Sequence, residues 1–181
     1  MTKRIILAVS GSISAYKSAD LTSKLKKKGY DVHVIMTEAA QAFITPLTLQ
    51  VLSKNPVHTD VLEEKLADRI NHIDLGKKAD LFIVAPASAN TIAKLANGMA
   101  DNMLTATALA LPSTIPKLIA PAMNTKMYDN PLTKKNLNTL DQLGYQEILP
   151  KSGVLACGDT GRGALADINV ILEAIDAKLM H

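Results

Sequence analysis

The chain has 181 residues, with 20 Lys and Arg against 17 Asp and Glu, a formal net charge of +3 and 48% hydrophobic residues. The length predicts one domain, the hydrophobic content excludes a disordered chain, and the balanced charge argues against a nucleic-acid binder. A single cysteine excludes a disulfide framework and a cysteine-rich metal cluster, and it fits a reducing compartment. No apolar stretch reaches the roughly 20 residues of a membrane span, so we expect a cytoplasmic protein that does not bind membranes.

The first elements follow the pattern of a strand, a helix and a second strand. Residues 4–9 are a continuous apolar run before a glycine–serine turn, which is typical of a strand buried on both faces. Residues 13–28 have helical spacing and end in three lysines before Gly29, as a helix C-terminus prefers. Residues 31–36 then complete a βαβ unit. The next expected elements are short helices over 38–44 and 46–52, and a weakly patterned segment over 53–78 with an edge strand near Val57.

The second half of the chain continues this alternation. Residues 81–85 form another apolar run of strand length, which Pro86 is expected to end. The further expected elements are helices over 88–97 and 101–110, a strand over 117–120, a helix over 131–143, a last strand over 145–149 and a closing helix over 167–180. This order predicts an α/β fold, Rossmann-like or flavodoxin-like, with a mainly parallel sheet flanked by helices. We expect residues 1–181 to form a single domain.

The loop over residues 10–17 is a candidate phosphate site, because ligands of open α/β sheets bind beyond the C-terminal ends of the strands. Its small residues, hydroxyl groups and backbone N–H groups lead directly into a helix. It contains one glycine and therefore matches neither the dinucleotide fingerprint nor the P-loop, which favours a monophosphate. On these residues alone, a tight turn without a ligand is an equally good interpretation.

Two further loops, over residues 86–91 and 121–128, each place an asparagine and hydroxyl groups after a strand and beside a proline. Asn90 and Asn124 are suited to cap the helices that follow, which is the simpler interpretation of either loop alone. The presence of both loops beside a phosphate site instead favours a shared ligand site.

The segment over residues 153–163 has four glycines in eleven residues and carries Cys157. Such a composition predicts a flexible flap with an exposed, reactive thiol, although a lone cysteine is more often an inert buried residue. His72 has a side chain suited to general-base catalysis, although a structural role is the commoner one for a single histidine. No spacing of His, Cys, Asp and Glu indicates a zinc site.

Taken in order, these segments resemble the flavin-containing cysteine decarboxylase family. The resemblance rests on residues 11–17, His72, 86–91, 121–124 with Met127, and 156–159, which follow the family order across nearly the whole chain. It implies FMN as the cofactor, with its phosphate on the first loop and its ring system held by the second. The cofactor residues it implies are Gly11, Ser12, Ile13, Thr37, Phe43, Ser88, Ala89, Asn90, Thr91 and Met123.

The resemblance further implies decarboxylation of a phosphorylated cysteine conjugate, 4′-phosphopantothenoylcysteine, to 4′-phosphopantetheine in coenzyme A biosynthesis. The substrate thiol would be oxidised, CO2 lost and the resulting enethiol reduced, with His72 as base, Asn124 binding the carboxylate and Cys157 as proton donor. Family members form homotrimers or higher homo-oligomers with active sites between subunits. The chain ends after the closing helix, so we expect a decarboxylase that is not fused to the preceding synthetase.

The sequence departs from the family pattern at three positions, where Ser14, Tyr128 and Ala164 replace the common alanine, tryptophan and arginine. Arg162 is a candidate to reach the space of the missing arginine. The alternative functions are a peptidyl-cysteine decarboxylase, which Cys157 disfavours, a flavin prenyltransferase, and a flavin-binding regulatory subunit without catalysis. A nicotinamide-binding domain is disfavoured by the missing glycine fingerprint.

Overall fold

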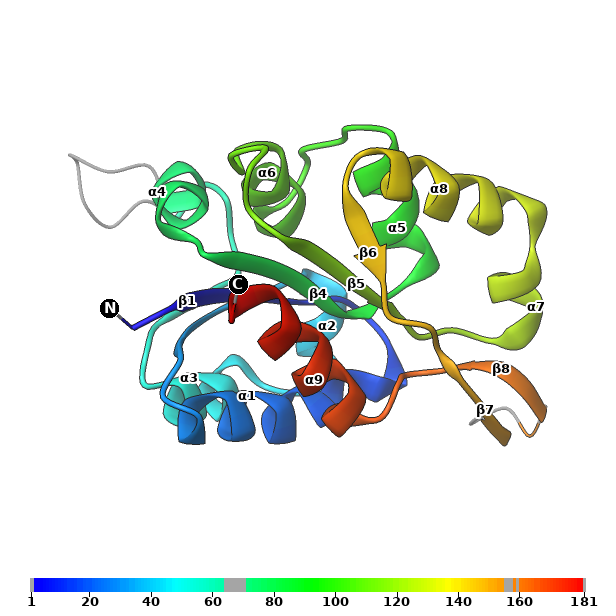
Figure 1. The fold of residues 1–181 in the computed structure, drawn as a ribbon, viewed down its shortest axis with the longest axis horizontal. Helices are drawn as coiled ribbons and strands as arrows, with labels where there is room; N and C mark the ends of the chain where they lie inside the picture. Colours follow the sequence, from blue (N-terminus) through cyan, green and yellow to red (C-terminus); the bar gives the residue numbers. More distant parts are fainter. Residues whose placement is uncertain (1, 64–70, 155–157, 159, 181) are drawn as a thin grey trace.

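The computed structural model describes residues 2–63, 71–154, 158 and 160–180. A six-stranded parallel sheet in the order β3-β2-β1-β4-β5-β6 forms the centre of the molecule, and a separate antiparallel hairpin, β7-β8, lies at one end (Figure 1). The sheet strands are β1 (Arg4–Val9), β2 (Asp31–Met36), β3 (Val57–His58), β4 (Leu81–Ala87), β5 (Lys117–Pro121) and β6 (Tyr145–Glu147); the hairpin strands are β7 (Lys151–Val154) and β8 (Thr160–Ala164).

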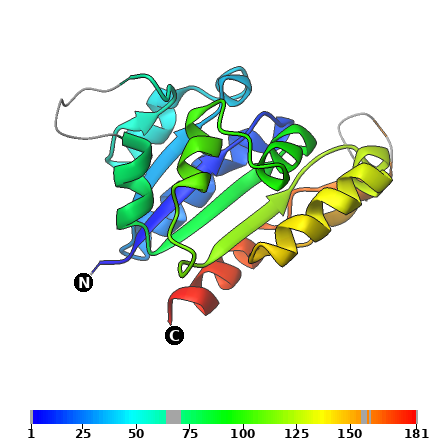
Figure 2. The same ribbon diagram turned by 90° about the horizontal axis from the view of Figure 1, so that it is seen from above.

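Helices cover both faces of the sheet, as Figures 1 and 2 show from two directions. One layer contains α1 (Ser18–Lys27), α3 (Pro46–Ser53) and α9 (Ile168–Leu179). The opposite layer contains α4 (Asn71–Lys78), α5 (Ala89–Ala96), α6 (Met103–Leu109) and α8 (Pro131–Gln142). The short elements η1 (Ile13–Lys17), α2 (Glu38–Gln41) and α7 (Thr125–Asp129) follow β1, β2 and β5.

The strands are apolar on both faces because each face is covered by helices. In β1, Ile5 and Leu7 belong to the core beneath α1 and α9, while Ile6 and Ala8 belong to the core beneath α4, α5 and α6. All four side chains are fully buried. This alternation explains why β1 is a continuous apolar run rather than a half-polar strand. The expected single α/β domain with a parallel sheet is confirmed.

Two expectations about strand ends are wrong. Pro86 does not end β4, because the strand continues to Ala87 through a cis Ala85–Pro86 peptide bond and a register shift against β5. Proline has no backbone N–H to donate, but its carbonyl oxygen accepts hydrogen bonds from the backbone N–H and the hydroxyl of Ser10. The strand that begins at Tyr145 is not the last one, since β7 and β8 form an antiparallel hairpin after it. Part of the expected flap, residues 155–157 and 159, lies outside the described residues.

The expected helices are present, with small changes. The helix expected over 13–28 is divided into a 3-10 turn, η1, and the regular helix α1. The sequence did not predict α4 or α7 as helices. Among the described residues, no helix is both long enough and apolar enough to pass through a bilayer.

Candidate functional site

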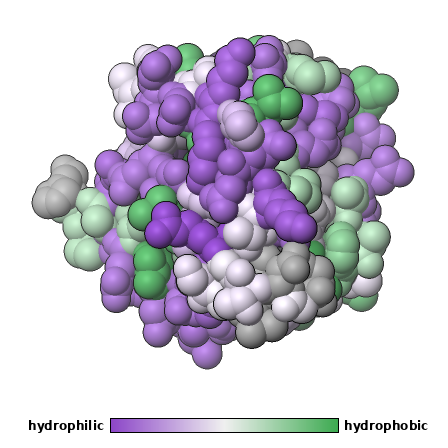
Figure 3. Space-filling model, turned by 90° about the vertical axis from the view of Figure 1, so that its right-hand side faces the viewer, coloured by the Kyte–Doolittle hydropathy of each residue, from purple (hydrophilic) through white to green (hydrophobic). Residues whose placement is uncertain are grey.

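A cavity of about 890 Å³ opens at the C-terminal edge of the sheet. The loops that follow β1, β2, β4 and β5 line it, and β8 of the hairpin closes one side. This end of the molecule faces the viewer in Figure 3, where hydrophilic residues predominate and hydrophobic ones are scattered. Cavities of this size typically hold a cofactor or a drug-sized ligand.

The loop after β1, which the sequence suggests as a phosphate site, lines one side of the cavity. A Cβ atom on Gly11 would lie 2.5 Å from the Cβ of Ala39, so only glycine allows the loop to lie this close to α2. The hydroxyl of Ser12 accepts a hydrogen bond from the Ser14 N–H and caps η1. Within the described part of the chain, no hydrogen bond uses the N–H groups of Gly11, Ser12 or Ile13. Three adjacent N–H donors without acceptors suit a phosphate group.

The loop after β4 is tied to the first loop by the buried side chain of Ser10. Its hydroxyl donates to the carbonyl oxygen of Pro86 at 2.8 Å and accepts from the Ser88 N–H at 2.8 Å. Ser88 in turn caps α5 by accepting from the Thr91 N–H. The hydroxyl of Ser18 donates to the carbonyl oxygen of Ala85. These bonds hold the two loops at a fixed separation across the cavity.

The loop after β5 brings Asn124 to the cavity. The Asn124 side-chain oxygen accepts from the Lys126 N–H at 2.8 Å, so this residue caps α7 and also lines the cavity. Asn124 can therefore cap the helix and line a ligand site at the same time. The Met123 N–H donates to the carbonyl oxygen of Gly163 at 2.9 Å, which joins this loop to β8.

Two glycines allow the hairpin to lie against the Asn124 loop. A Cβ atom on Gly163 would lie 2.3 Å from the carbonyl oxygen of Met123, and one on Gly161 would lie 2.6 Å from the hydroxyl of Thr125. The glycines of β8 thus permit close packing of the hairpin against this loop within the chain.

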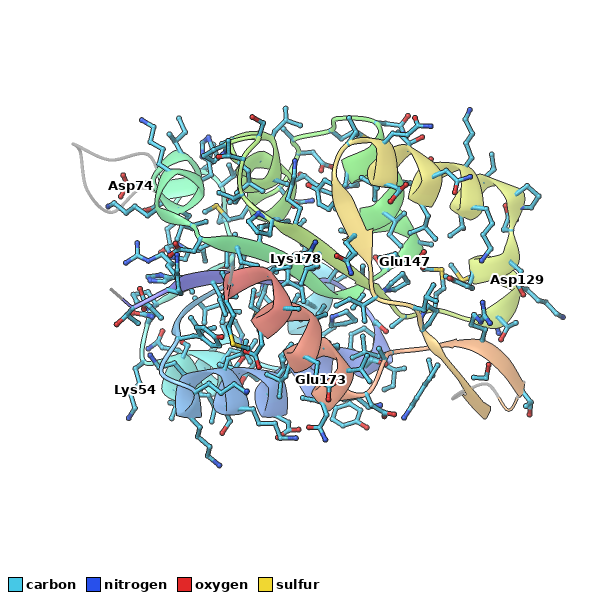
Figure 4. The ribbon with its side chains drawn as sticks, viewed as in Figure 1. Lys54, Asp74, Asp129, Glu147, Glu173 and Lys178 are labelled. Atoms are coloured by element: carbon cyan, nitrogen blue, oxygen red, sulfur yellow. The ribbon has the colours of Figure 1, made fainter. Side chains whose placement is uncertain are left out.

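Tyr128 fixes the far end of α7. Its ring is buried, and its hydroxyl donates to a carboxylate oxygen of Glu147 on β6 at 2.8 Å. Figure 4 labels Glu147, and also Asp129 at the end of α7. Burial raises the pKa of Tyr128 above its usual range, and the Glu147 carboxylate raises it further. The ammonium group of Lys134 lies 3.4 Å from the centre of the Tyr128 ring. The tyrosine hydroxyl therefore stays protonated and holds α7 against the sheet.

The cavity brings together nearly all the residues that the sequence assigns to the cofactor, with Asn124. Those that line it are Gly11, Ser12, Ile13, Thr37, Ser88, Ala89, Asn90, Thr91, Met123 and Asn124. Phe43 follows α2, is 47% exposed and lies outside this lining. His72 lies in the first turn of α4, also outside it. Its Nδ1 is buried and has no hydrogen-bond partner among the described residues. Cys157 lies outside the described residues.

Sequence reasoning missed one wall of the cavity, formed by Lys94, Asp101 and Asn102. Lys94 on α5 forms an ion pair with Asp101. Asn102 caps α6 by accepting from the Thr105 N–H, and its amide nitrogen donates to Asp101. The only signal for this wall is the capping pattern of an asparagine three residues before a threonine, which does not by itself indicate a ligand site.

The chain is similar to known proteins over nearly its whole length. The Flavoprotein family profile matches residues 1–180. The chain is 62% identical over 179 residues to a probable phosphopantothenoylcysteine decarboxylase of Streptococcus mutans serotype c, a match that covers 99% of this chain and 100% of that relative. It is 53% identical over 171 residues to the coenzyme A biosynthesis bifunctional protein CoaBC of Bacillus subtilis. This second match covers 94% of the chain but only 42% of the bifunctional protein.

Solved structures share the fold over the full chain. A PPC decarboxylase with a cysteine-to-serine mutation, complexed with pantothenoylaminoethenethiol, matches with a TM-score of 0.92 at 35% identity and covers 100% of both chains. The FMN binding protein AtHal3 matches with a TM-score of 0.86 at 36% identity, covering 98% of this chain and 96% of that one.

Proposed function

Because the chain belongs to the Flavoprotein family, we propose that it is an FMN-dependent decarboxylase that converts 4′-phosphopantothenoylcysteine to 4′-phosphopantetheine in coenzyme A biosynthesis. The observation that carries this proposal is one cavity that joins a phosphate-binding loop to the Asn124 loop. The 62% identity to the probable decarboxylase of Streptococcus mutans supports the same substrate. The family resemblance inferred from the sequence is confirmed.

The residues of the cavity fit FMN. The unused N–H groups of Gly11, Ser12 and Ile13 are suited to its phosphate, and the residues from Ser88 to Thr91 would hold the ring system. FMN when bound supplies an oxidant for the substrate thiol and returns the electrons to the enethiol, so that the overall reaction is redox-neutral. The polypeptide itself offers no group able to accept the electrons released by decarboxylation.

The substrate carboxylate would bind to the amide of Asn124. An amide donates hydrogen bonds without adding a positive charge that would favour keeping CO2 attached. The hairpin flanking Cys157 packs against this loop through Gly161 and Gly163, which supports a role for the thiol at the same place.

His72 would act as the base from a neighbouring subunit. It lies outside the cavity lining of its own chain, so a homotrimer or higher homo-oligomer with active sites between subunits would be needed to bring it to the substrate. We expect the enzyme to work in the cytoplasm, where coenzyme A is made.

The experiment that tests the proposal combines a spectrum with a product assay. We expect the purified protein to be yellow, to release FMN on denaturation and to form 4′-phosphopantetheine from the phosphorylated substrate. A product that retains the enethiol would instead indicate a peptidyl-cysteine type of decarboxylase. A colourless protein that does not bind added FMN would contradict the proposal, as would flavin binding without release of CO2.

A variant separates the role of the cysteine from the earlier steps. Cys157→Ser should still release CO2 but accumulate a product that lacks two hydrogens relative to 4′-phosphopantetheine, which mass spectrometry detects. Complexation of a cysteine-to-serine PPC decarboxylase with an enethiol supports this order of steps. Full formation of 4′-phosphopantetheine by the variant would exclude Cys157 as the donor.

A further inference from the structure

A second cavity of about 430 Å³ lies next to the main one. Tyr16 and Lys17, at the end of η1, line both cavities. The segment after β8 also runs along both, since Ala164 lines the main cavity and Ala166 the second. The two cavities therefore form one path that leads from the Asn124 loop past Tyr16 and Lys17.

Lys17 carries a positive charge in this path that belongs to no ion pair among the described residues. In the described part of the chain it has no carboxylate within ion-pair distance. The two carboxylates of the second cavity have lysine partners, since Asp20 pairs with Lys24 and Asp167 with Lys151. The hydrogen bond from Lys151 lowers the pKa of Asp167, and the charge of Lys17 lowers it further. In the main cavity, Lys94 is paired with Asp101. A doubly charged anion in the path would thus meet Lys17 as its available cation.

Tyr16 offers an apolar contact at the same junction. Its side chain is 58% exposed, and the Lys17 ammonium lies 6.0 Å from the ring centre. An exposed aromatic ring with a cation over it suits a ligand that is apolar along its chain and anionic at its end.

Arg162, the residue that the sequence suggests for the substrate phosphate, lies elsewhere. It is exposed on β8, lines neither cavity, and its charge acts on the Tyr128 hydroxyl. Ala164, at the position of the common family arginine, lines the main cavity close to the shared wall but carries no charge.

We propose that Lys17, with Tyr16, forms the subsite for the phosphate end of the substrate, which extends from the main cavity into the second one. This inference rests on the proposed function. The phosphate and the cysteinyl carboxylate of the extended substrate are on the order of 12 Å apart, so a substrate bound at Asn124 has to extend its other end beyond the reacting centre. Lys17 in this way supplies a positive charge in place of the arginine that is common in the family at the position of Ala164.

The test compares the phosphorylated substrate with its dephosphorylated form, pantothenoylcysteine. In FMN-loaded Lys17→Met, KM for the phosphorylated substrate should rise about tenfold, while KM for the dephosphorylated form and kcat for both change less than about twofold. Lys17→Arg should restore most of the affinity. Lys27→Met, which removes a lysine at the end of α1 that lines neither cavity, is the matched control and should change neither KM.

Three results would overturn the subsite. Equal losses for both substrates would make Lys17 a structural residue, and a phosphate-specific loss in Arg162→Met instead would move the subsite to β8. A fall in FMN affinity of Lys17→Met, measured by flavin fluorescence, would assign the lysine to the cofactor phosphate.

Calorimetry with 4′-phosphopantetheine and pantetheine separates this inference from the proposed function. If the wild type turns over neither substrate, the proposed function has failed. A preference for the phosphorylated ligand that disappears in Lys17→Met would still support the anion subsite, and the lack of any preference would contradict it.

Discussion

Single glycines set the distances between the segments that form the site. Gly11 allows the loop after β1 to pack closely against α2, and Gly163 allows β8 to pack closely against the Asn124 loop. Gly153, on the paired strand of the same hairpin, has no heavy atom of a described residue within 4 Å of its Cβ position. The hairpin therefore contains two glycines, Gly161 and Gly163, whose lack of a side chain is required by packing, and one, Gly153, for which it is not.

Substitution of Gly163 and of Gly153 should have different effects. Gly163→Ala places a methyl group 2.3 Å from the Met123 carbonyl oxygen, so the hairpin and the Asn124 loop have to separate. We expect a loss of about 1–3 kcal/mol in the free energy of unfolding and at least a tenfold lower kcat/KM. Gly153→Ala is the control and should change stability by less than about 0.5 kcal/mol. Urea unfolding measures the free energy of unfolding, and steady-state kinetics measure kcat/KM. Similar losses in the two variants would refute the claim that packing requires Gly163 but not Gly153.

At the scale of elements, α7 is a five-residue helix that depends on contacts at both ends. Asn124 caps its start, and Tyr128 ties its end to Glu147 on β6. Tyr128→Phe removes the hydroxyl and leaves a partly buried carboxylate without this donor. We expect about 1–2 kcal/mol lower stability and a raised KM, because Asn124 moves with the helix.

Tyr145→Phe is the matched control for this variant. Tyr145 is also buried, burial raises its pKa to about 12, and no hydrogen bond of its hydroxyl exists among the described residues. Its substitution should leave KM unchanged. If Tyr128→Phe alters stability but not KM, then α7 is not the element that positions Asn124.

The opposite edge of the sheet contains a charged cluster that makes stability depend on pH. Burial raises the pKa of Asp31, but hydrogen bonds from Asn55 and Arg4 outweigh it and lower the pKa to about 2. Because this value lies below the ordinary one of about 4, the stabilisation is complete above pH 4 and is lost as the pH falls toward 2.

Asp31→Asn should therefore flatten the acid side of the stability profile. Over pH 4 to 2, the slope of unfolding free energy against pH should decrease by up to about 1.4 kcal/mol per pH unit, the value for one proton. Asp129→Asn, which changes an exposed carboxylate 3.6 Å from Lys134, should leave the slope unchanged. Urea unfolding at a series of pH values measures the slope of unfolding free energy against pH. An unaltered slope in Asp31→Asn would show that other carboxylates control acid unfolding.

Elements were predictable where burial alone determines their sequence, as in β1 and β2. The helix α4 was not, because Gly76 lowers its intrinsic helix propensity. That glycine is explained only by tertiary packing, since its Cβ position lies 3.1 Å from the Ala110 carbonyl oxygen near the end of α6. The helix α7 is too short to show periodicity, and β4 passes through a proline whose carbonyl oxygen accepts a hydrogen bond from Ser10 in the loop after β1. Each miss depends on a contact distant in sequence.

For the whole molecule, the loops of the site were predictable because strand ends of a parallel sheet meet at one edge. The wall of Lys94 and Asp101 was not, since it combines a side chain of α5 with one from the turn before α6. His72 lies at the start of a crossover helix outside the cavity lining, so the proposed chemistry requires a second copy of the chain. The assembly thus becomes a testable part of the active site.

Mixing two inactive variants tests whether subunits share active sites. His72→Asn removes the proposed base and Cys157→Ser the proposed donor, so each alone should form no 4′-phosphopantetheine. In co-expressed mixed oligomers, a site between two subunits takes its histidine from one chain and its cysteine from the other. With equal random mixing, about one quarter of the sites contain both groups, and product formation should recover to about that fraction of the wild type.

The control for this experiment is co-expression of His72→Asn with the double variant His72→Asn, Cys157→Ser, which has no intact histidine and should stay inactive. FMN content should match the wild type in every mixture, because His72 lies outside the cavity of its own chain. If the first mixture also stays inactive while FMN is bound, His72 and Cys157 act within one chain. Residues 71–78 would then have to move toward the cavity during catalysis, and a homo-oligomer would no longer be needed to complete the site.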